Sequence, residues 1–273
     1  MSVDLSVITV THNRCALLRR KLAALAKQTL PPERFELIVL VNACTDGTVK
    51  LLESTVTPYR LRVLESERNL SPACARNLCA REATGDALYF SDDDCLPSPT
   101  TLAAHVAAQV RPCVAIGWLE FVSDENCELW QPRRVSFWNL NGANTSVPTD
   151  PFQAVGGFDE TLSGYGGEDV ALGYTLKHLP FVALPDALAQ HLGPNPRHSG
   201  NLEKARSAGC NAQRLAGRYP SLAYRLGVHW GLLPLKRFVL LGPLRHLWRP
   251  LAPQLYTYER AYLLGALEEK RRD

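Results

Sequence analysis

Apolar runs alternate with segments of helical spacing over the first 95 residues, and this alternation limits the possible folds more than any other feature. The runs have the length and composition of buried strands. Between the first two runs, leucines recur at helical spacing from Arg14 until the chain reaches Pro31. Such alternation predicts an α/β fold with a mostly parallel sheet between helices. The predicted strands are LSVITVT at 5–11, FELIVLV at 35–41, LRVLE at 61–65 and DALYFS at 86–91.

The pattern changes after residue 97. Predicted helices and strands over 98–200 no longer alternate regularly, and a late strand is expected at 181–185. Beyond residue 200 the sequence is helical, basic and aromatic. We therefore predict an α/β domain over residues 1–200 and a basic helical extension over residues 201–273.

The net charge of +3, from 30 basic and 27 acidic residues, is too small to indicate a nucleic-acid partner. The eight cysteines show no C-x-x-C spacing and no accompanying histidine cluster, so a structural zinc site is not expected. Because the first predicted strand begins at residue 5, we expect no signal peptide. We therefore expect a cytoplasmic protein with reduced cysteines.

Three carboxylates, Asp92, Asp93 and Asp94, directly follow the predicted strand at 86–91. In parallel α/β sheets, ligands bind at the carboxyl ends of the strands. Carboxylates grouped there suit a hard divalent cation with oxygen ligands, such as Mg²⁺ or Mn²⁺. The alternative is a solvated acidic cap before the next helix.

Several motifs, in this order, resemble those of the family 2 glycosyltransferases, whose GT-A fold is Rossmann-like. The resemblance covers most of residues 3–192, and it is more specific than any one motif. Its last two motifs resemble the galactosyltransferase-like subset. The motifs are VITVTHNR, ERNLSPACARN at 67–77, YFSDDD with its D-x-D pair, GANTSV at 142–147, GGFDE at 156–160 and GYGGEDVALGY at 164–174.

The resemblance implies that residues 1–97 bind a nucleoside-diphosphate sugar and that residues 98–200 bind its acceptor. A cation, Mn²⁺ or Mg²⁺, would neutralise the charge on the departing diphosphate. Asp94 is the expected metal ligand, together with Asp92 and with His191 at the end of ALAQH; His198 is the alternative histidine. The remaining donor-binding residues implied are Thr11, Asn13, Asn42, Asp46, Arg76 and Asp93.

On the acceptor side, the resemblance implies that Asp169 is the general base and that Glu168 binds the acceptor. One base without a covalent nucleophile implies a single displacement that inverts the anomeric carbon. The alternative is that these acids only favour a helix N-terminus. The other acceptor-binding residues implied are Asn144, Gly157, Phe158, Asp159, Gly166 and Gly167.

The sequence departs from the family at two places. Val41 stands where the family has the aspartate that reads the nucleotide base, with Asn42 as its substitute after a shift of one residue. Ala171 stands where an acid is common. The nucleotide therefore stays open, and so do two other functions: a nucleotidyltransferase, which would share the sheet and the metal-binding aspartates, and a non-catalytic relative that binds nucleotide or sugar.

Residues 226–250 combine leucine and tryptophan with several basic residues, around a break at Pro243. This pattern is typical of an amphipathic helix at a membrane surface, and such a helix would contact the inner face of the membrane peripherally. The alternative is packing on the catalytic domain or in a dimer. The acceptor, a glycan, a lipid-linked molecule or a small molecule in glycoconjugate or polysaccharide biosynthesis, stays open, as does the oligomeric state.

Overall fold

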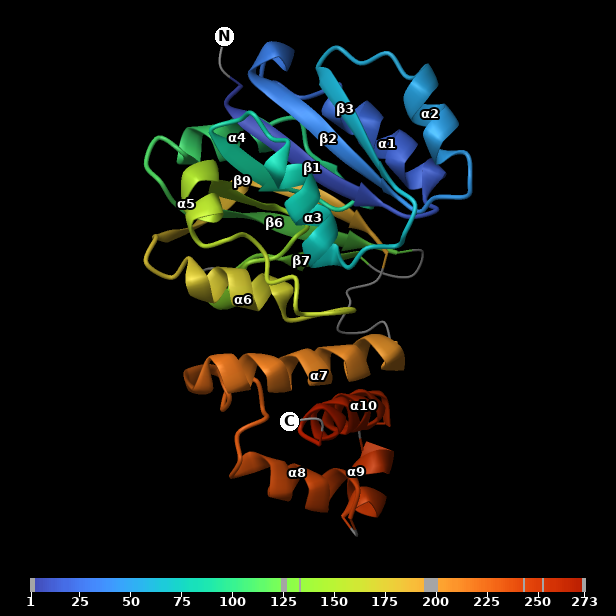
Figure 1. Ribbon diagram of the computed structural model, residues 1–273, viewed down its shortest axis with the longest axis vertical. Helices are drawn as coiled ribbons and strands as arrows, with labels where there is room; N and C mark the ends of the chain where they lie inside the picture. The colour runs from blue at the N-terminus through green and yellow to red at the C-terminus, as the bar shows by residue number, and fades with distance from the viewer. Residues whose placement is uncertain are drawn as a thin grey trace. The chain divides into compact units, whose positions relative to one another are not determined.

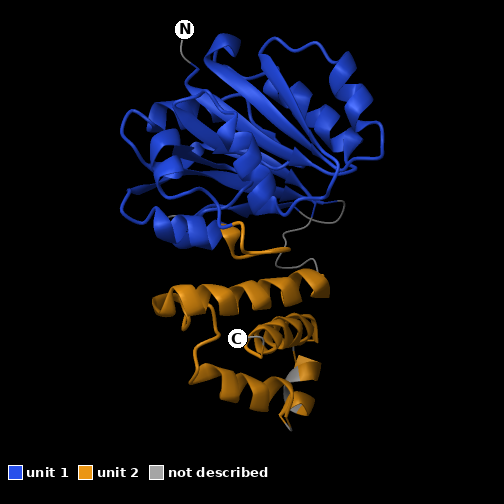
Figure 2. Ribbon diagram, in the orientation of Figure 1, with its two compact units in different colours: residues 1–159, 169–195 blue, residues 160–168, 196–273 orange. Residues whose placement is uncertain are grey.

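The computed structural model (Figure 1) describes residues 3–123, 127–132, 134–193, 201–242, 244–251 and 253–271. The alternative metal ligand His198 and the predicted break at Pro243 lie outside these residues. The chain divides into two compact units (Figure 2). The sheet unit comprises Met1–Asp159 and Asp169–Asn195, and the helical unit comprises Glu160–Glu168 and Pro196–Asp273.

The first half of the sheet is parallel, as the alternating pattern predicts. Its strands are β1 (Leu5–Thr11), β2 (Phe35–Asn42), β3 (Arg60–Ser66) and β4 (Ala87–Phe90), in the spatial order β3-β2-β1-β4. All three pairings among them are parallel. The predicted α/β fold with a mostly parallel sheet is therefore confirmed.

The order continues β8-β6-β9-β5, with β7 paired to β6, and this half is mixed. Its strands are β5 (Cys95–Pro97), β6 (Val114–Val122), β7 (Cys127–Trp130), β8 (Thr145–Pro148) and β9 (Phe181–Leu192).

Strand β9 is much longer than the strand predicted at 181–185. Pro185 and Asp186 look like an end of strand in the sequence. In the structure, a bulge opposite Gly117 and Trp118 absorbs the irregularity, and the strand continues beside β6 and β5. The register pairs Cys95 with His191.

Helices cover both faces of the sheet (Figure 1). Alternate residues of the strands face opposite sides, so Ile8 and Ile38 pack with α3 while Val7 and Leu37 pack with α1. The helices of this part of the chain are α1 (Cys15–Leu25), α2 (Thr48–Ser54), α3 (Pro72–Arg81), α4 (Thr101–Ala108), α5 (Thr149–Ala154) and α6 (Glu168–Thr175), with short 3₁₀ turns at Pro32–Arg34 and Phe137–Asn139.

The predicted helical C-terminal extension is confirmed. It consists of α7 (Leu202–Arg218), the 3₁₀ turn Pro220–Leu222, α8 (Leu232–Leu240), α9 (Arg245–Leu251) and α10 (Pro253–Glu269). Gly209 and Gly265 let α7 and α10 pack closely, because a Cβ atom at either glycine would collide with the backbone of the other helix. None of the described helices is both long and apolar enough to span a membrane.

A buried histidine on α4 makes the stability of the sheet unit pH-dependent. His105 is fully buried, and its ring nitrogens lie 2.8 Å from Ser146 Oγ and 3.0 Å from Asn144 Oδ1. Burial lowers its pKa from 6.5 to about 4, because the charged ring would lose its hydration. Between these values only the unfolded chain protonates the ring, so the contribution of His105 to the free energy of unfolding is lost as the pH falls.

We therefore expect a His105→Gln variant to lose less stability than the parent chain between about pH 6.5 and about pH 4. Urea unfolding at several pH values measures both profiles. Other titrating groups contribute equally to the two proteins and cancel in the comparison. Parallel profiles would contradict the prediction.

Candidate active site

The three aspartates form a fixed turn directly after β4, at the carboxyl end of the parallel strands. Below them lies Lys21 of α1, whose ammonium group is fully buried. It donates hydrogen bonds to Ser91 Oγ at 2.6 Å and to the carbonyl oxygens of Asp92 at 2.9 Å and Cys95 at 3.0 Å. Burial lowers the pKa of Lys21. Its bonds hold the backbone on both sides of Asp93 and Asp94.

The Asp93 carboxylate accepts hydrogen bonds from other side chains of the protein. It accepts a hydrogen bond from Thr11 Oγ1 at 2.8 Å and another from Arg14 at 2.9 Å, and Arg14 also bonds Asp94 at 2.8 Å. Burial, with a smaller contribution from the Asp94 carboxylate, raises the pKa of Asp93 to about 6, although Arg14 acts in the opposite direction. Asp93 and Thr11 therefore join the ends of β4 and β1, and their contact with a donor stays a prediction.

Asp94 and His191 come together because β9 extends to residue 192. Their Oδ1 and Nε2 atoms are 3.6 Å apart, and with Cys95 they form a group whose ligand atoms lie within 4.8 Å of one another. Two ligands that each lie about 2.1 Å from one ion can be separated by this distance. The other ring nitrogen of His191 is buried and has no hydrogen-bond partner among the described residues.

The chemistry of this group suits a hard or borderline divalent cation. The carboxylate of Asp94 and the imidazole of His191 are both ligands for Mn²⁺. Burial raises the pKa of the Cys95 thiol well above its usual value, so this sulfur stays protonated and is a poor ligand. Asp92, which the sequence analysis placed with Asp94, lies outside the group and accepts a hydrogen bond from Arg76 at 2.9 Å.

Arg76 of α3 links the aspartate turn to the start of α6. Its guanidinium group bonds Asp92 and lies 3.6 Å from Asp169 Oδ1. The backbone N–H of Gly142 donates to the other oxygen of Asp169 at 3.2 Å. A side chain at Gly142 would collide with the guanidinium group, and the ring of Phe158 lies 5.5 Å from it. The guanidinium group of Arg76 is therefore close to the carboxylates of both Asp92 and Asp169.

Asn42, at the end of β2, is fully used by hydrogen bonds within the protein. Its Oδ1 accepts from the N–H of Leu70 at 2.8 Å, and its Nδ2 donates to Asn69 Oδ1 at 2.9 Å and to the Leu70 carbonyl at 3.0 Å. Val41 is buried in the strand. Asn42 therefore connects β2 to the loop before α3, and its recognition of a nucleotide base stays a prediction.

Asn13 and Asp46 hold the loops after β1 and β2. Asn13 has a positive φ of 53° and accepts a hydrogen bond from the N–H of Thr45 at 2.7 Å. Asp46 accepts from Cys15 and from both the N–H and the hydroxyl of Thr48, which caps the start of α2. The hydroxyl of Thr48 lowers the pKa of Asp46. The two residues shape this edge of the sheet, and their contact with a donor stays a prediction.

The GGFDE motif is held by the last asparagine of the ERNLSPACARN motif. Asn77 accepts from the N–H of Phe158 and donates to its carbonyl oxygen, both at 2.9 Å. Gly157 has a φ of +74°, and a Cβ atom there would lie 2.6 Å from Asn77 Oδ1. The buried Phe158 belongs to the core, and the half-buried Asp159 follows it.

Asn144, predicted to bind the acceptor, is buried in the core, and its contact with an acceptor stays a prediction. Its side chain is 0% exposed and bonds the hydroxyl of Tyr89, the ring of His105 and the carbonyl oxygens of Trp118 and Ala187. No polar atom of this side chain is left for an acceptor in this structure. It ties β4, α4, β6 and β9 together.

The segment that leads to Glu168 is anchored within the helical unit. Gly166 and Gly167 have φ values of +88° and +97°, which other residues rarely adopt. The buried Asn211 of α7 donates to the carbonyl oxygens of Gly166 at 2.7 Å and Ser163 at 3.1 Å. This anchor fixes the approach to Glu168, which begins α6 directly before Asp169.

Arg14, Lys21 and Asn211 are not among the site residues predicted from the sequence. Lys21 had a visible signal, because it falls on the buried stripe that Leu18, Leu22 and Leu25 define. Arg14 stands in the turn after β1, where ligand-binding residues are expected. Asn211 had no such signal, because the contact between α7 and residues 160–168 depends on the fold.

Comparisons with known proteins identify the same family. Residues 6–165 match the profile of the family described as Glycosyl transferase family 2. The chain is 30% identical over 265 residues to the validoxylamine A glucosyltransferase of Streptomyces hygroscopicus subsp. limoneus. The alignment covers 80% of this chain and 57% of that relative, so the chain spans little more than half of the relative's length.

Two solved structures share the fold. The mannosyltransferase PcManGT from Pyrobaculum calidifontis, in complex with GDP-Man and Mn²⁺, superposes with a TM-score of 0.69 at 20% identity, over 99% of this chain and 88% of that one. Residues 1–349 of TarS from S. aureus, in complex with UDP, superpose with a TM-score of 0.62 at 19% identity, over 99% and 92%. These likenesses support the GT-A fold.

Proposed function

The chain belongs to glycosyltransferase family 2, and we propose that it transfers a sugar from a nucleoside-diphosphate sugar to an acceptor hydroxyl, with inversion of the anomeric carbon. The observation that carries this proposal is the arrangement around Arg76. A candidate metal pair, Asp94 and His191, lies at the aspartate turn, and Arg76 connects Asp92 of that turn to the candidate base Asp169.

On the donor side, Asp94 and His191 would hold the cation, which supplies positive charge to the departing diphosphate. Complexes with nucleotides or nucleotide sugars are known for both neighbours, and one of them contains Mn²⁺. Arg76 would contribute a second positive charge, because its guanidinium group can bond a phosphate bidentately once it leaves Asp92.

On the acceptor side, Asp169 would take the proton of the attacking hydroxyl. The N–H of Gly142 holds one carboxylate oxygen of Asp169, and the guanidinium group of Arg76 lies 3.6 Å from the other. Glu168, the preceding residue, would hydrogen-bond the acceptor. Proton transfer to Asp169 and departure of the nucleoside diphosphate complete one displacement, so no covalent intermediate is required.

The names of similar proteins suggest which sugar and which acceptor to test first. Two of them, at 30% and 29% identity, are named validoxylamine A glucosyltransferase. We therefore propose a glucosyl donor and a small-molecule acceptor as the first pair to test, with glycan and lipid-linked acceptors next. A nucleotidyltransferase would need the metal site but not the Asp169 base. A non-catalytic relative would bind its ligand without transferring a sugar, so it would not need the base either.

We expect UDP-glucose, UDP-N-acetylglucosamine or GDP-mannose to raise the melting temperature only when Mn²⁺ is present. At about 100 times Kd a ligand adds roughly 2.7 kcal/mol, or about 5 °C for a chain of this size. Asp94→Asn should abolish this shift, whereas Asp186→Asn, an exposed acid on β9, should preserve it. Absence of any shift for the parent chain with Mn²⁺ present would overturn the donor site.

The transfer itself is tested by nucleoside diphosphate release with validoxylamine A as the first acceptor. An increase in release that depends on an acceptor supports glycosyl transfer. In a parallel assay with a nucleoside triphosphate in place of the nucleotide sugar, incorporation of a nucleotide into the product with release of pyrophosphate would instead show a nucleotidyltransferase. Donor binding without either product, across all three acceptor classes, would indicate the non-catalytic relative.

A further inference from the structure

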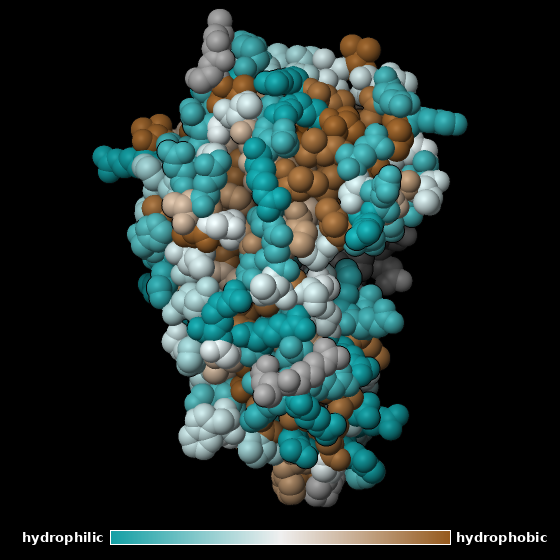
Figure 3. Space-filling view, in the orientation of Figure 1, coloured by the Kyte–Doolittle hydropathy of each residue, from teal (hydrophilic) through white to brown (hydrophobic). Residues whose placement is uncertain are grey.

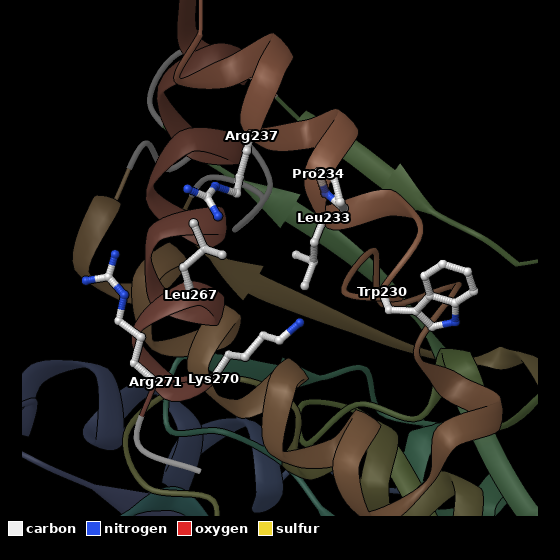
Figure 4. Close-up of a pocket in the computed structure, with 7 residues that line it drawn as sticks. All are labelled: Trp230, Leu233, Pro234, Arg237, Leu267, Lys270 and Arg271. Atoms are coloured by element: carbon white, nitrogen blue, oxygen red, sulfur yellow. The ribbon is translucent and has the colours of Figure 1, made fainter.

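A cavity of about 500 Å³ lies within the helical unit, between α8 and the end of α10 (Figure 4). Leu233, Pro234 and Leu267 give it an apolar lining. Three cations, Arg237, Lys270 and Arg271, and the ring of Trp230 complete it. The cavity thus combines apolar walls with positive charge.

The cations of this cavity differ from three other cations of the same unit, which are paired with glutamates. Lys236, Arg206 and Arg214 bond Glu259, Glu268 and Glu269 respectively. Arg237, Lys270 and Arg271 make no ion pair within the described part of the chain. Like charges at one cavity repel one another, so an anion that enters it gains from all three.

The sequence around the cavity attracts anions over a longer stretch. Residues 204–258 contain nine lysines and arginines and no aspartate or glutamate, and three of the nine are paired with glutamates that follow this stretch. The small net charge of +3 for the whole chain hides this segregation. A surface of this kind is drawn to a negatively charged layer more strongly than to a single dissolved ion, because many charges act together.

Large apolar side chains are exposed beside the cavity. Trp230 is 77% exposed, and Phe238, at 52%, lies one helical turn from Pro234 of the cavity wall. Elsewhere on the unit, Leu235, on the side of α8 opposite Leu233 and Arg237, is 58% exposed, and Leu251 on α9 is 85% exposed. On the face visible in Figure 3, apolar and hydrophilic residues of this unit lie side by side. Exposed tryptophan and leucine among basic residues are typical of proteins that lie in a membrane interface.

We propose that this cavity binds the phosphate headgroup of an anionic phospholipid, while Trp230 and Phe238 enter the membrane surface beside it. A soluble phosphate would account for the three cations but not for the exposed apolar side chains next to them. The bilayer accounts for both. The inference goes beyond the proposed sugar transfer and does not depend on it.

The test is cosedimentation of the full chain with vesicles of phosphatidylcholine, with and without phosphatidylglycerol. We expect binding only to the phosphatidylglycerol vesicles, with a decrease as salt is raised. Arg237→Glu with Lys270→Glu should weaken it by roughly tenfold or more. Lys27→Glu with Lys50→Glu in the sheet unit, two exposed lysines and the same change in net charge, should weaken it far less.

A second variant separates the apolar contribution. Trp230→Ala should weaken vesicle binding at high salt, and its exposed side chain makes loss of folding unexpected. Equal binding by the two charge-reversed proteins, or equal binding to both vesicle types, would overturn the proposal. A rise in melting temperature with inorganic phosphate but no vesicle binding would also overturn it. So would self-association of the chain that Trp230→Ala abolishes. Vesicle binding is measured without donor, so its failure and the failure of the donor site are seen in different assays.

Discussion

Asp169→Asn is expected to lower the rate of sugar transfer by about 10²–10⁴-fold, the usual contribution of a positioned general base. An amide cannot take the proton of the attacking hydroxyl. It still offers an oxygen to the N–H of Gly142, which bonds the carboxylate in the parent chain. The shape of the site is therefore preserved while its basicity is lost.

The measurement is acceptor-dependent release of nucleoside diphosphate at saturating donor, together with the donor-induced rise in melting temperature. The thermal shift with Mn²⁺ should stay within the error of the parent value, because the donor ligands are unchanged. Asp150→Asn, an exposed acid on α5, is the control and should keep full activity. A parent-like rate for Asp169→Asn would exclude Asp169 as the base.

The sheet could be predicted because its signal is local. Each of the first four strands is an uninterrupted apolar run, since both of its faces are covered by helices. The position of Asp92, Asp93 and Asp94 followed from the same pattern, because the turn after a parallel strand lies at the ligand-binding edge. His191 could be placed near Asp94 only through the resemblance, since its strand seemed to end at Pro185.

Which polar residues are bonded within the protein and which are left for a ligand could not be predicted, because this depends on neighbours far apart in sequence. Asn144 and Asn42 stand in motifs but are fully bonded within the protein. Lys21 falls on the buried stripe of its helix, but its three hydrogen bonds to the aspartate turn are not visible in that spacing. Burial and partners decide such roles, and neither is visible in residue spacing.

The helical unit should affect catalysis through Asn211, which bonds the segment before Glu168. We expect Asn211→Asp to lower the transfer rate by roughly tenfold to a hundredfold, because a small displacement of reacting groups is costly. The carboxylate has the same shape as the amide but donates no hydrogen bond, so the carbonyl oxygens of Ser163 and Gly166 lose their partner. Two such losses should also reduce the free energy of unfolding by about 2–4 kcal/mol.

If Asn211 positions Glu168, its loss should change acceptor kinetics but leave donor binding intact. A general loss of stability would reduce both. For Asn211→Asp, the acceptor KM should rise and kcat should fall, while the Mn²⁺-dependent donor shift remains, because the donor ligands lie in the sheet unit. Gln213→Ala on the same helix is the control and should change neither constant, because Gln213 makes no hydrogen bond to the described residues 160–168. Equal losses of donor shift and transfer would mean that Asn211 acts on folding alone. Unchanged acceptor kinetics would separate the helical unit from the chemistry.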